Sequence, residues 1–409
     1  MYIADFHIHS RYSRATSREM DLDTLPAWAQ RKGVHLVGTG DFSHDLWYHT
    51  LRERLLPSDR HGIYRCSGTD FILTTEVCVL FEKHDRLRRI HLLVFVPTLE
   101  GAGRLNRFLE RYGNLESDGR PMLHLSAEEL VQAVNDCDDD AFVVPAHIWT
   151  PHFSLFGSNS GFDTVEECFG RYSDHIFCLE TGLSSDPEMN WRLSALDRFS
   201  LISNSDAHSP NRLGREANVF SAPFDFTQLR AILGTKDTSR FLMTIEYFPE
   251  EGKYHYDGHR VCGARLSPEE TIRRGGLCPV CRRRVTVGVL HRVTDLADRP
   301  AGFRPDGAVP FRRLVPLDQI LASALGKGAD TQAVTDLYME IVRTIAPELT
   351  LLLDTPREIL ESRLEPTVAE SILRVRAGQV TVVPGYDGVF GEVTICPAAA
   401  ETTGEQTLF

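Results

Sequence analysis

The stretch ADFHIHS, residues 4–10, places Asp5, His7 and His9 at every second position, with the apolar Phe6 and Ile8 between them. Alternate residues of a β-strand lie on the same face, so a strand here presents the three polar side chains together. Such a face is typical of a metal site at the mouth of a barrel. A polar strand face wetted by solvent has the same pattern, so the rest of the chain has to distinguish the two.

The composition is that of an ordinary globular protein. The 409 residues suggest two or three domains, with 25% charged and 42% hydrophobic residues. No apolar run approaches the length of a membrane helix, and the first ten residues resemble no signal peptide, so we expect a cytoplasmic protein. The net charge of −13 argues mildly against a nucleic-acid partner, but residues 250–313 carry +5 and the rest −18.

Residues 1–249 alternate short apolar strands with helical stretches. Strands are predicted at 2–8, 34–40, 72–81, 90–97, 141–147, 175–180, 200–206 and 241–248. Helices are predicted at 23–32, 126–136 and 224–234, and Ser126 and Glu129 have the spacing of a capping box. Repeated βα units imply a mostly parallel sheet, and seven or eight strands favour a closed or nearly closed barrel.

Polar residues gather where these strands end. They are Asp41, His147, Glu180, Asp206 and His208. Active sites of such barrels lie at the carboxyl ends of the strands, so we expect these side chains to converge. One such residue is usually an ordinary loop residue, whereas several of metal-ligand type on separate strands favour a metal centre.

A second region, predicted at 250–315, has the composition of a small metal-binding module. His259 and Cys262 are separated from Cys278 and Cys281 by fifteen residues, which predicts a tetrahedral structural zinc site. His255 is an alternative to His259, and three cysteines clustered by chance are the alternative to a zinc site. The other six cysteines are scattered and are interpreted as small core residues of a reducing compartment.

Arginines surround the second pair of cysteines. They are Arg273, Arg274, Arg282, Arg283 and Arg284. They could face phosphate groups, although a solvated basic surface has the same composition. Residues 316–409 form the third predicted region, with amphipathic helices, a hairpin with turns at 384–385 and 387–388, and a frayed tail.

Six motifs together resemble those of the PHP (polymerase and histidinol phosphatase) superfamily. They are DFHIHS (5–10), GTGDFSH (38–44), TTEV (74–77), IHLLVF (90–95), PAHIWTP (145–151) and SNSDAHS (203–209). More narrowly, the chain resembles the endonuclease Q family along nearly its whole length, including HRVC (259–262), CPVC (278–281) and RAGQVTVVPGYDGVFGEV (376–393).

The resemblance implies an α/β fold with a distorted (β/α)7 barrel, a small zinc-binding module and a mainly helical C-terminal region. It also implies two or three catalytic metal ions, with zinc, manganese, magnesium and iron all open. The first ion would be held by His7, His9, Glu76 and Asp206. Glu76 would bridge to a second ion, held also by His91 and His147. A third would take His208 with either Asp41 or His44.

The chain departs from the family pattern in two places. Asp41 is followed by Phe42 rather than by histidine, and His44 comes three residues after Asp41. A histidine sometimes found after the first motif is absent, and Arg14 lies nearby, where it could clamp a phosphate. The third metal is therefore the one that the resemblance defines least.

The activity that the resemblance implies is that of a DNA repair endonuclease. It would hydrolyse the phosphodiester 5′ of a deaminated base (uracil, hypoxanthine or xanthine) or of an abasic site, by metal-activated water, with Asp206, Glu76 and His147 as catalytic residues. Double-stranded DNA would be its partner, with a replication clamp or helicase as a further candidate. A small-molecule phosphatase and a non-catalytic polymerase- or helicase-associated module are the alternatives.

Glu180 is predicted to distinguish damaged from normal bases. Uracil and hypoxanthine present an N–H where cytosine and adenine present a bare ring nitrogen, so a carboxylate acceptor would select the deaminated base after it is flipped out of the helix. Ser184 or Ser185 could donate to the neighbouring carbonyl. The alternative is that Glu180 caps its strand or pairs with another polar group.

Overall fold

The structure is a computed structural model that describes residues 1–395. The predicted frayed tail and Cys396 lie outside the described residues. The strands of the described residues are β1 (Tyr2–Asp5), β2 (Leu36–Gly38), β3 (Leu56–Pro57), β4 (Ile63–Cys66), β5 (Thr69–Ile72), β6 (Thr74–Lys83), β7 (Arg86–Phe95), β8 (Met122–Leu123), β9 (Phe142–Pro145), β10 (Cys178–Glu180), β11 (Ser200–Ile202), β12 (Ala217–Phe220), β13 (Phe241–Glu246), β14 (Asp257–His259), β15 (Ala264–Leu266), β16 (Phe311–Arg313), β17 (Val380–Val383) and β18 (Glu392–Ile395).

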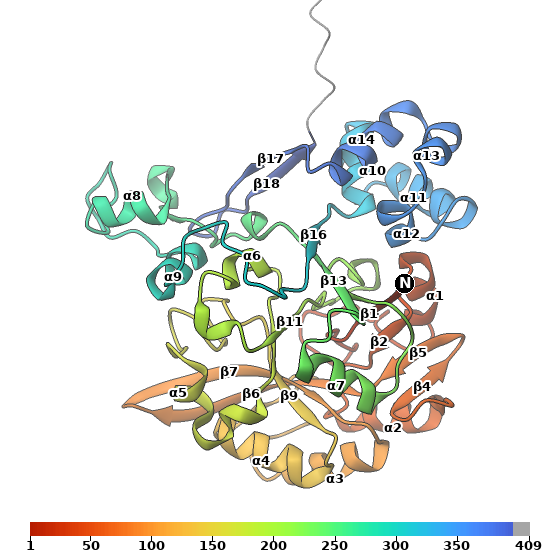
Figure 1. The fold of residues 1–409 in the computed structure, drawn as a ribbon, viewed down its shortest axis with the longest axis vertical. Coiled ribbons are helices and arrows are strands. Elements are labelled where there is room, and N and C mark those ends of the chain that lie inside the picture. The colour runs from red at the N-terminus through yellow and green to blue at the C-terminus, as the bar shows by residue number, and fades with distance from the viewer. Residues whose placement is uncertain (396–409) are drawn as a thin grey trace, which may run out of the picture.

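The α-helices lie between and after these strands (Figure 1). They are α1 (Leu25–Lys32), α2 (Asp45–Arg54), α3 (Leu99–Leu109), α4 (Ala127–Cys137), α5 (Val165–Phe169), α6 (Pro187–Asn190), α7 (Phe226–Thr235), α8 (Pro268–Arg273), α9 (Val289–Leu296), α10 (Leu317–Leu325), α11 (Gln332–Thr344), α12 (Glu348–Leu353), α13 (Arg357–Arg363) and α14 (Pro366–Arg376). Among the described residues, no helix is long and apolar enough to cross a membrane.

Seven strand segments enclose the interior of the first region, in the order β1, β2, β5 continuing into β6, β7, β9, β10 and β11. Hydrogen bonds join the separate sheets: the Ile148 N–H donates to the Glu180 carbonyl, and the His9 N–H donates to the Ala207 carbonyl. The barrel is distorted because β7 runs antiparallel to both β6 and β9, whereas β1–β2, β2–β5 and β10–β11 are parallel. The predicted barrel is therefore confirmed.

Apolar side chains from every barrel strand fill one end of the interior. The cluster contains Ala4, Leu36, Ile72, Leu93, Phe142, Cys178 and Ile202. Helix α7 closes this end, because its apolar face joins the same cluster and the Ser200 hydroxyl donates to the Leu233 carbonyl. Metal-ligand side chains are thereby confined to the opposite end, where the strands finish.

Helix α4, on the outside of the barrel, begins with the capping box that the sequence predicts. The Ser126 hydroxyl accepts a hydrogen bond from the Glu129 N–H, and the Glu129 carboxylate accepts from the Ser126 N–H, so the predicted capping box is present. Five of the six scattered cysteines lie buried among apolar residues, as predicted for core positions: Cys66, Cys78, Cys137, Cys168 and Cys178.

The chain after the barrel forms a hairpin-and-helix module and then a helical cluster, drawn in green to blue in Figure 1. Strands β14 and β15 pair antiparallel around the first Cys/His knuckle. Strand β16 returns to the barrel and extends its largest sheet beside β13. Helices α10 to α14 and the predicted hairpin of β17 and β18 follow.

A buried ion pair fastens the helical cluster to the barrel. The Lys32 ammonium of α1 lies 2.6 Å from the Glu348 carboxylate of α12, which also accepts a hydrogen bond from the Tyr338 hydroxyl of α11 at 2.7 Å. All three side chains are buried. A buried charge requires its partner, so this pair fixes where the helices sit on α1.

Candidate metal centre

Three buried side chains and one partly exposed one, Asp206, converge at the open end of the barrel. His7 and His9 follow β1, Glu76 lies on β6, and Asp206 follows β11. The His9 Nε2 atom lies 3.1 Å from Glu76 Oε2 and 3.0 Å from Asp206 Oδ1, and His7 Nε2 lies 3.4 Å from the same Glu76 oxygen. One donor atom from each residue lies within 4.8 Å of the other three.

A second group shares Glu76. Its other oxygen, Oε1, lies 2.7 Å from His91 Nδ1 and 3.0 Å from His147 Nε2. His91 comes from β7 and His147 follows β9. The two groups meet at one carboxylate, with one oxygen facing each, which is the geometry of a bridging ligand between two metal ions.

The donor atoms fit metal ions. His7 Nε2, His9 Nε2 and Asp206 Oδ1 are buried and have no hydrogen bond of acceptable geometry within residues 1–395. Buried polar atoms normally have partners, so convergent orphan atoms of imidazole and carboxylate type indicate metal binding. Zinc, manganese and iron all accept such donors.

Strained backbone holds several of these residues in place. His147 and Asp206 have φ values of +31° and +46°, and Asp41 has +51°, although none is glycine. Left-handed conformations of such residues cost free energy and are concentrated at functional sites. Here they turn the chain sharply at three strand ends and aim the side chains into the centre.

Hydrogen bonds on the far side of two imidazoles select their tautomers. His9 Nδ1 lies 3.0 Å from Asp41 Oδ1, and His7 Nδ1 lies 3.0 Å from Glu180 Oε1. With a proton on Nδ1 donated to these carboxylates, the Nε2 lone pair faces the metal position. Asp41 and Glu180 therefore orient ligands.

The charged side chains of the metal centre shift one another's pKa values. Burial raises the pKa of the Asp206 carboxyl, but the proximity of His9 at 3.0 Å and the charges of His7 and His9 outweigh it, and the pKa is lowered. Burial lowers the pKa of His91 to about 4, so its imidazole is neutral at neutral pH. Burial lowers the pKa of His7, His9 and His147 as well, but the neighbouring carboxylates outweigh it and raise their pKa. A metal ion would therefore have to displace the protons of these three imidazoles.

The residues of the predicted third metal group, Asp41, His44 and His208, all contact protein groups. Both Asp41 oxygens accept hydrogen bonds: Oδ1 from His9 Nδ1, and Oδ2 from the Ser10 N–H and from the hydroxyls of Ser10 and Ser13. The His44 ring stacks on Tyr12 at 4.5 Å, and His208 Nδ1 contacts the carbonyl of Asp206. The third metal group, His208 with Asp41 or His44, therefore stays a prediction.

Base recognition by Glu180 is not supported by its surroundings. The side chain is buried, and its oxygens meet three protein donors: His7 Nδ1, the His147 N–H at 2.8 Å and Asn204 Nδ2 at 2.8 Å. Because these oxygens are occupied inside the barrel wall, the carboxylate has no free face for a flipped base. The alternative, pairing with another polar group, describes what the structure shows.

We therefore expect Glu180→Gln to reduce cleavage equally on uracil, hypoxanthine and abasic substrates. An amide offers one acceptor oxygen to three donors, so His7 loses its alignment and metal affinity falls by about 10–100-fold. Cleavage rates on the three duplexes, measured at limiting and saturating metal, check this. If Glu180→Gln lost cleavage only on the uracil and hypoxanthine duplexes, which carry a base, Glu180 would be assigned to base recognition after all.

The remaining predicted residues lie at the periphery of the centre. The Arg14 side chain is 89% exposed and its Nε lies 4.0 Å from Asp118 Oδ2, so it is free to reach a phosphate in solution. Ser184 Oγ is buried with no partner among the described residues, whereas Ser185 Oγ donates to the Thr181 carbonyl. Of these serines, only Ser184 has an uncommitted hydroxyl in residues 1–395.

Sequence reasoning missed Arg120. Its guanidinium Nη1 lies 3.2 Å from Glu76 Oε2, on the oxygen that faces the first group. Arg120 lies in the connection between α3 and β8, which has neither strand periodicity nor a motif. The only available signal was the short sequence Asp118-Gly119-Arg120, whose glycine marks a turn or a close approach.

The second predicted metal site is also assembled. His259, Cys262, Cys278 and Cys281 have donor atoms within 4.8 Å of one another, and His259 Nδ1 lies 3.4 Å from Cys281 Sγ. The backbone N–H of Cys281 lowers the pKa of the Cys278 thiol to about 6, which favours the thiolate. Three thiols and one imidazole at this spacing indicate a structural zinc site. His255, the alternative ligand, is not part of the cluster.

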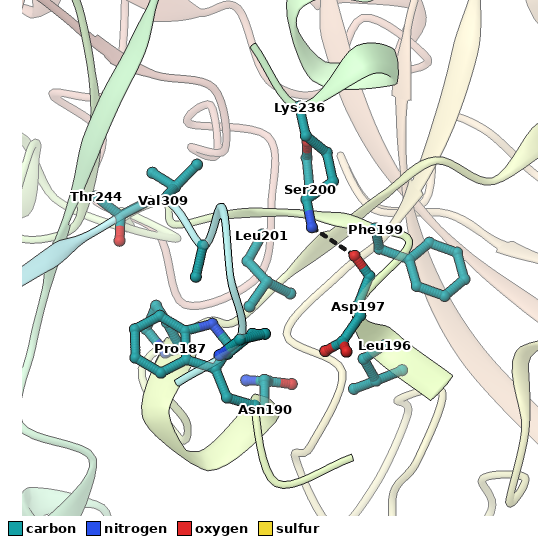
Figure 2. Close-up of a pocket in the computed structure, with 13 residues that line it drawn as sticks. Pro187, Asn190, Leu196, Asp197, Phe199, Ser200, Leu201, Lys236, Thr244 and Val309 are labelled. Atoms are coloured by element: carbon teal, nitrogen blue, oxygen red, sulfur yellow. Dashed lines mark hydrogen bonds between the residues drawn. The ribbon is translucent and has the colours of Figure 1, made fainter. Parts of the chain in front are cut away.

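A cavity lies beside β11 and α6 (Figure 2), and the residues that line it belong to neither metal cluster. It is lined by Asn190, Leu196, Phe199, Leu201 and Val309 among others, and its volume is about 20 Å³, which is room for about one water molecule. The Lys236 ammonium donates to the Asp197 carbonyl at its rim. It is a packing gap, and the chemistry of the molecule lies at the strand ends.

Comparison with known proteins agrees with this geometry. A model of the MJ0043 C-terminal domain matches residues 316–379. The chain is 30% identical over 284 residues to the uncharacterized protein MJ0043 of Methanocaldococcus jannaschii, covering 66% of this chain and 34% of that protein, so it spans about a third of that relative's length. It is 28% identical over 411 residues to the uncharacterized protein YqxK of Bacillus subtilis, covering 95% and 98% of the two chains.

Two solved structures are similar over the whole fold. The lesion-specific endonuclease PfuEndoQ from Pyrococcus furiosus matches with a TM-score of 0.85 and 33% identity, covering 96% of this chain and 95% of that one. Endonuclease Q in complex with a 27-mer duplex substrate, with an abasic lesion at the active site, matches with a TM-score of 0.84 and 33% identity over both entire chains. On this identity and coverage, the chain belongs to the endonuclease Q family.

Proposed function

We propose that the protein is a metal-dependent endonuclease that cuts DNA beside a damaged nucleotide. The observation that carries the proposal is the pair of buried donor groups joined at Glu76, at the strand ends of a chain 33% identical to a lesion-specific endonuclease. A phosphodiester is an anion that repels hydroxide, and two bridged metal ions are a general solution to that problem.

The proposed roles follow from the contacts of each residue. His7, His9 and Asp206 would hold the first metal ion, His91 and His147 would hold the second, and Glu76 would be a ligand of both. Such metals would supply charge that neutralises the phosphate and lowers the pKa of water. Asp206, Glu76 and His147 are the catalytic residues of the proposal.

The zinc module offers a surface suited to a duplex. Val261 and Val280, one in each knuckle, are 86% and 68% exposed. The five nearby arginines are all exposed as well: Arg273, Arg274, Arg282, Arg283 and Arg284. Exposed apolar residues beside cations match the groove and phosphates of DNA, and this supports the second region, 250–315, as a part that grips the duplex; the same role is proposed for the third region, 316–409.

Neutralising the arginine run should weaken duplex binding in a salt-dependent way. We expect Arg282→Gln, Arg283→Gln and Arg284→Gln combined to reduce affinity for undamaged and damaged duplexes alike, because phosphate contacts carry no base information. Each lost contact should reduce the slope of log affinity against log salt by about 0.9. Fluorescence anisotropy between low and moderate salt measures the slope; an unchanged slope would leave the run as a merely solvated surface.

The proposed substrates are duplexes that contain uracil, hypoxanthine, xanthine or an abasic site, cut on the 5′ side of the lesion. The abasic substrate has the most direct support, since a 33% identical relative is solved with such a lesion at its active site. A replication clamp or helicase is proposed as a recruiting partner.

The test is a nicking assay on end-labelled duplexes, each with one lesion at a defined position. The protein is loaded in turn with Mg²⁺, Mn²⁺ or Zn²⁺, and a phosphate monoester such as histidinol phosphate is assayed on the same preparation. We expect one product that ends 5′ of the lesion and no monoester hydrolysis. Hydrolysis of the monoester alone would identify a phosphatase, and activity on neither would identify a non-catalytic module.

A further inference from the structure

Arg120 places a positive charge against the carboxylate that joins the two metal groups. Its Nη1 atom lies 3.2 Å from Glu76 Oε2, and 27% of its side chain is exposed. Arg120 therefore contacts the buried centre through its guanidinium while part of its side chain is exposed to solvent. None of the family motifs in the sequence includes it.

The backbone that carries Arg120 is pinned on both sides. A Cβ atom on Gly119 would lie 2.3 Å from Asp41 Oδ2 and 2.4 Å from Ser13 Oγ, so only glycine fits against the residues that orient His9. The Gly119 N–H donates to the Tyr12 carbonyl, and the Pro121 carbonyl accepts from the Cys78 N–H, two residues along β6 from Glu76. The guanidinium is thus delivered from a fixed position.

Arg120 and the first metal group use the same oxygen. Glu76 Oε2 faces His9 Nε2 at 3.1 Å, His7 Nε2 at 3.4 Å and Arg120 Nη1 at 3.2 Å. A divalent cation held by these donors would share that oxygen with the guanidinium and repel it. The exposed part of the side chain gives it a path outward, toward an anion at the mouth of the centre.

We propose that Arg120 is a catalytic residue that contacts a non-bridging oxygen of the scissile phosphate, and that its ion pair with Glu76 holds it beside the phosphate position before substrate binds. The inference rests on the proposed endonuclease function. A guanidinium suits this role because its planar donors match a phosphate and its charge persists at every working pH. It complements charge that develops on the phosphate oxygens during attack.

The test compares Arg120→Ala and Arg120→Lys with a matched control. Arg111→Ala removes an exposed arginine from the same connection, where its guanidinium stacks on Phe108, far in sequence from any ligand. Three quantities are measured on each protein: Mn²⁺ affinity by titration calorimetry, affinity for an abasic duplex, and the single-turnover cleavage rate at saturating Mn²⁺.

We expect Arg120→Ala to cut about 100-fold or more slowly at saturating metal, the loss typical of one electrostatic donor to a transition state. Its Mn²⁺ affinity should be equal or higher, because a competing cation is gone. Arg120→Lys should recover part of the rate, and Arg111→Ala should match wild type. Slower chemistry with undiminished metal binding is the signature that a structural role would not produce.

Other outcomes overturn the inference in distinguishable ways. If Arg120→Ala loses Mn²⁺ affinity together with rate, Arg120 only supports Glu76. If Arg120→Ala cuts at the wild-type rate, it does not touch the phosphate, and the endonuclease function still holds. If wild-type protein cuts none of the lesion duplexes, the proposed function fails and the inference fails with it. Gly119→Ala, whose Cβ would clash with Asp41 and Ser13, should lose Mn²⁺ affinity as well as rate and so shows the signature of a disturbed metal ligand.

Discussion

Glu76→Gln is expected to abolish cleavage and to disrupt both metal groups at once. The substitution keeps the size of the side chain but replaces one of the two bridging oxygens by an amide nitrogen and removes the negative charge. That charge faces four histidines and Arg120. Losing the shared ligand of two metal ions should slow the reaction by about 1000-fold or more.

Metal content and nicking rate, measured on the same preparation, check this result. Glu82→Gln is the matched control, because Glu82 lies on the same strand with an exposed side chain. Asp206→Asn should also abolish cleavage, but it touches only the first group and should leave the second metal ion and duplex binding largely intact. Full occupancy of both positions in Glu76→Gln would show that the carboxylate does not bridge.

Cys278→Ser is expected to release the zinc ion and unfold the module around it. The apolar core there consists only of Ala264, Leu266, Cys278 and Val285, with Cys262 packed against it. Such a small core cannot supply the folding energy, whereas structural zinc binding supplies about 10–16 kcal/mol in zinc-finger peptides. The barrel has its own core and should keep its melting transition.

Zinc stoichiometry, limited proteolysis and duplex affinity are the measurements for this variant. Cleavage sites for the protease should appear within residues 260–284, and duplex affinity should fall while the barrel stays resistant. Cys66→Ser is the control, because it makes the same chemical change at a buried barrel position away from both metal sites. Undiminished zinc content and affinity in Cys278→Ser would show that the ligand set is wrong.

The barrel and part of the donor set could be predicted because strands have a simple period, whereas Glu76 and His91, inside predicted strands, were expected only from the resemblance to the family. His7 and His9 alternate with apolar neighbours, and Asp206 follows an apolar run, so sequence spacing alone placed them at strand ends. The two-residue period also predicted that Asp5 would share a metal-binding face with His7 and His9, and this was wrong. The Asp5 carboxylate lies outside the metal clusters and accepts hydrogen bonds from the Ser205 and Gly214 N–H groups. Asp5 instead fixes the loop that carries Asp206, a role that only the closed barrel reveals.

Roles that depend on direction or on loops could not be predicted. Whether Glu180 faces a pocket or a histidine is decided by its side-chain direction, because a strand end allows both. Arg120 reaches the centre through a loop held by contacts distant in sequence, for which no period exists. Helices α12 and α13 are six and seven residues long, too short for a clear amphipathic pattern.

The buried ion pair of Lys32 and Glu348 limits how the helical cluster can be exchanged by recombination or redesign. Replacing Glu348 alone by an apolar residue would leave the Lys32 ammonium buried without its paired carboxylate, with Asp318 left as a nearby carboxylate, at a cost of about 3–5 kcal/mol. Recombination that exchanges the helical cluster must therefore transfer α1 with it, or replace both charges together. The barrel and the helical cluster therefore have to be exchanged together. New chain ends in an engineered version should be placed in the exposed connection at 326–330.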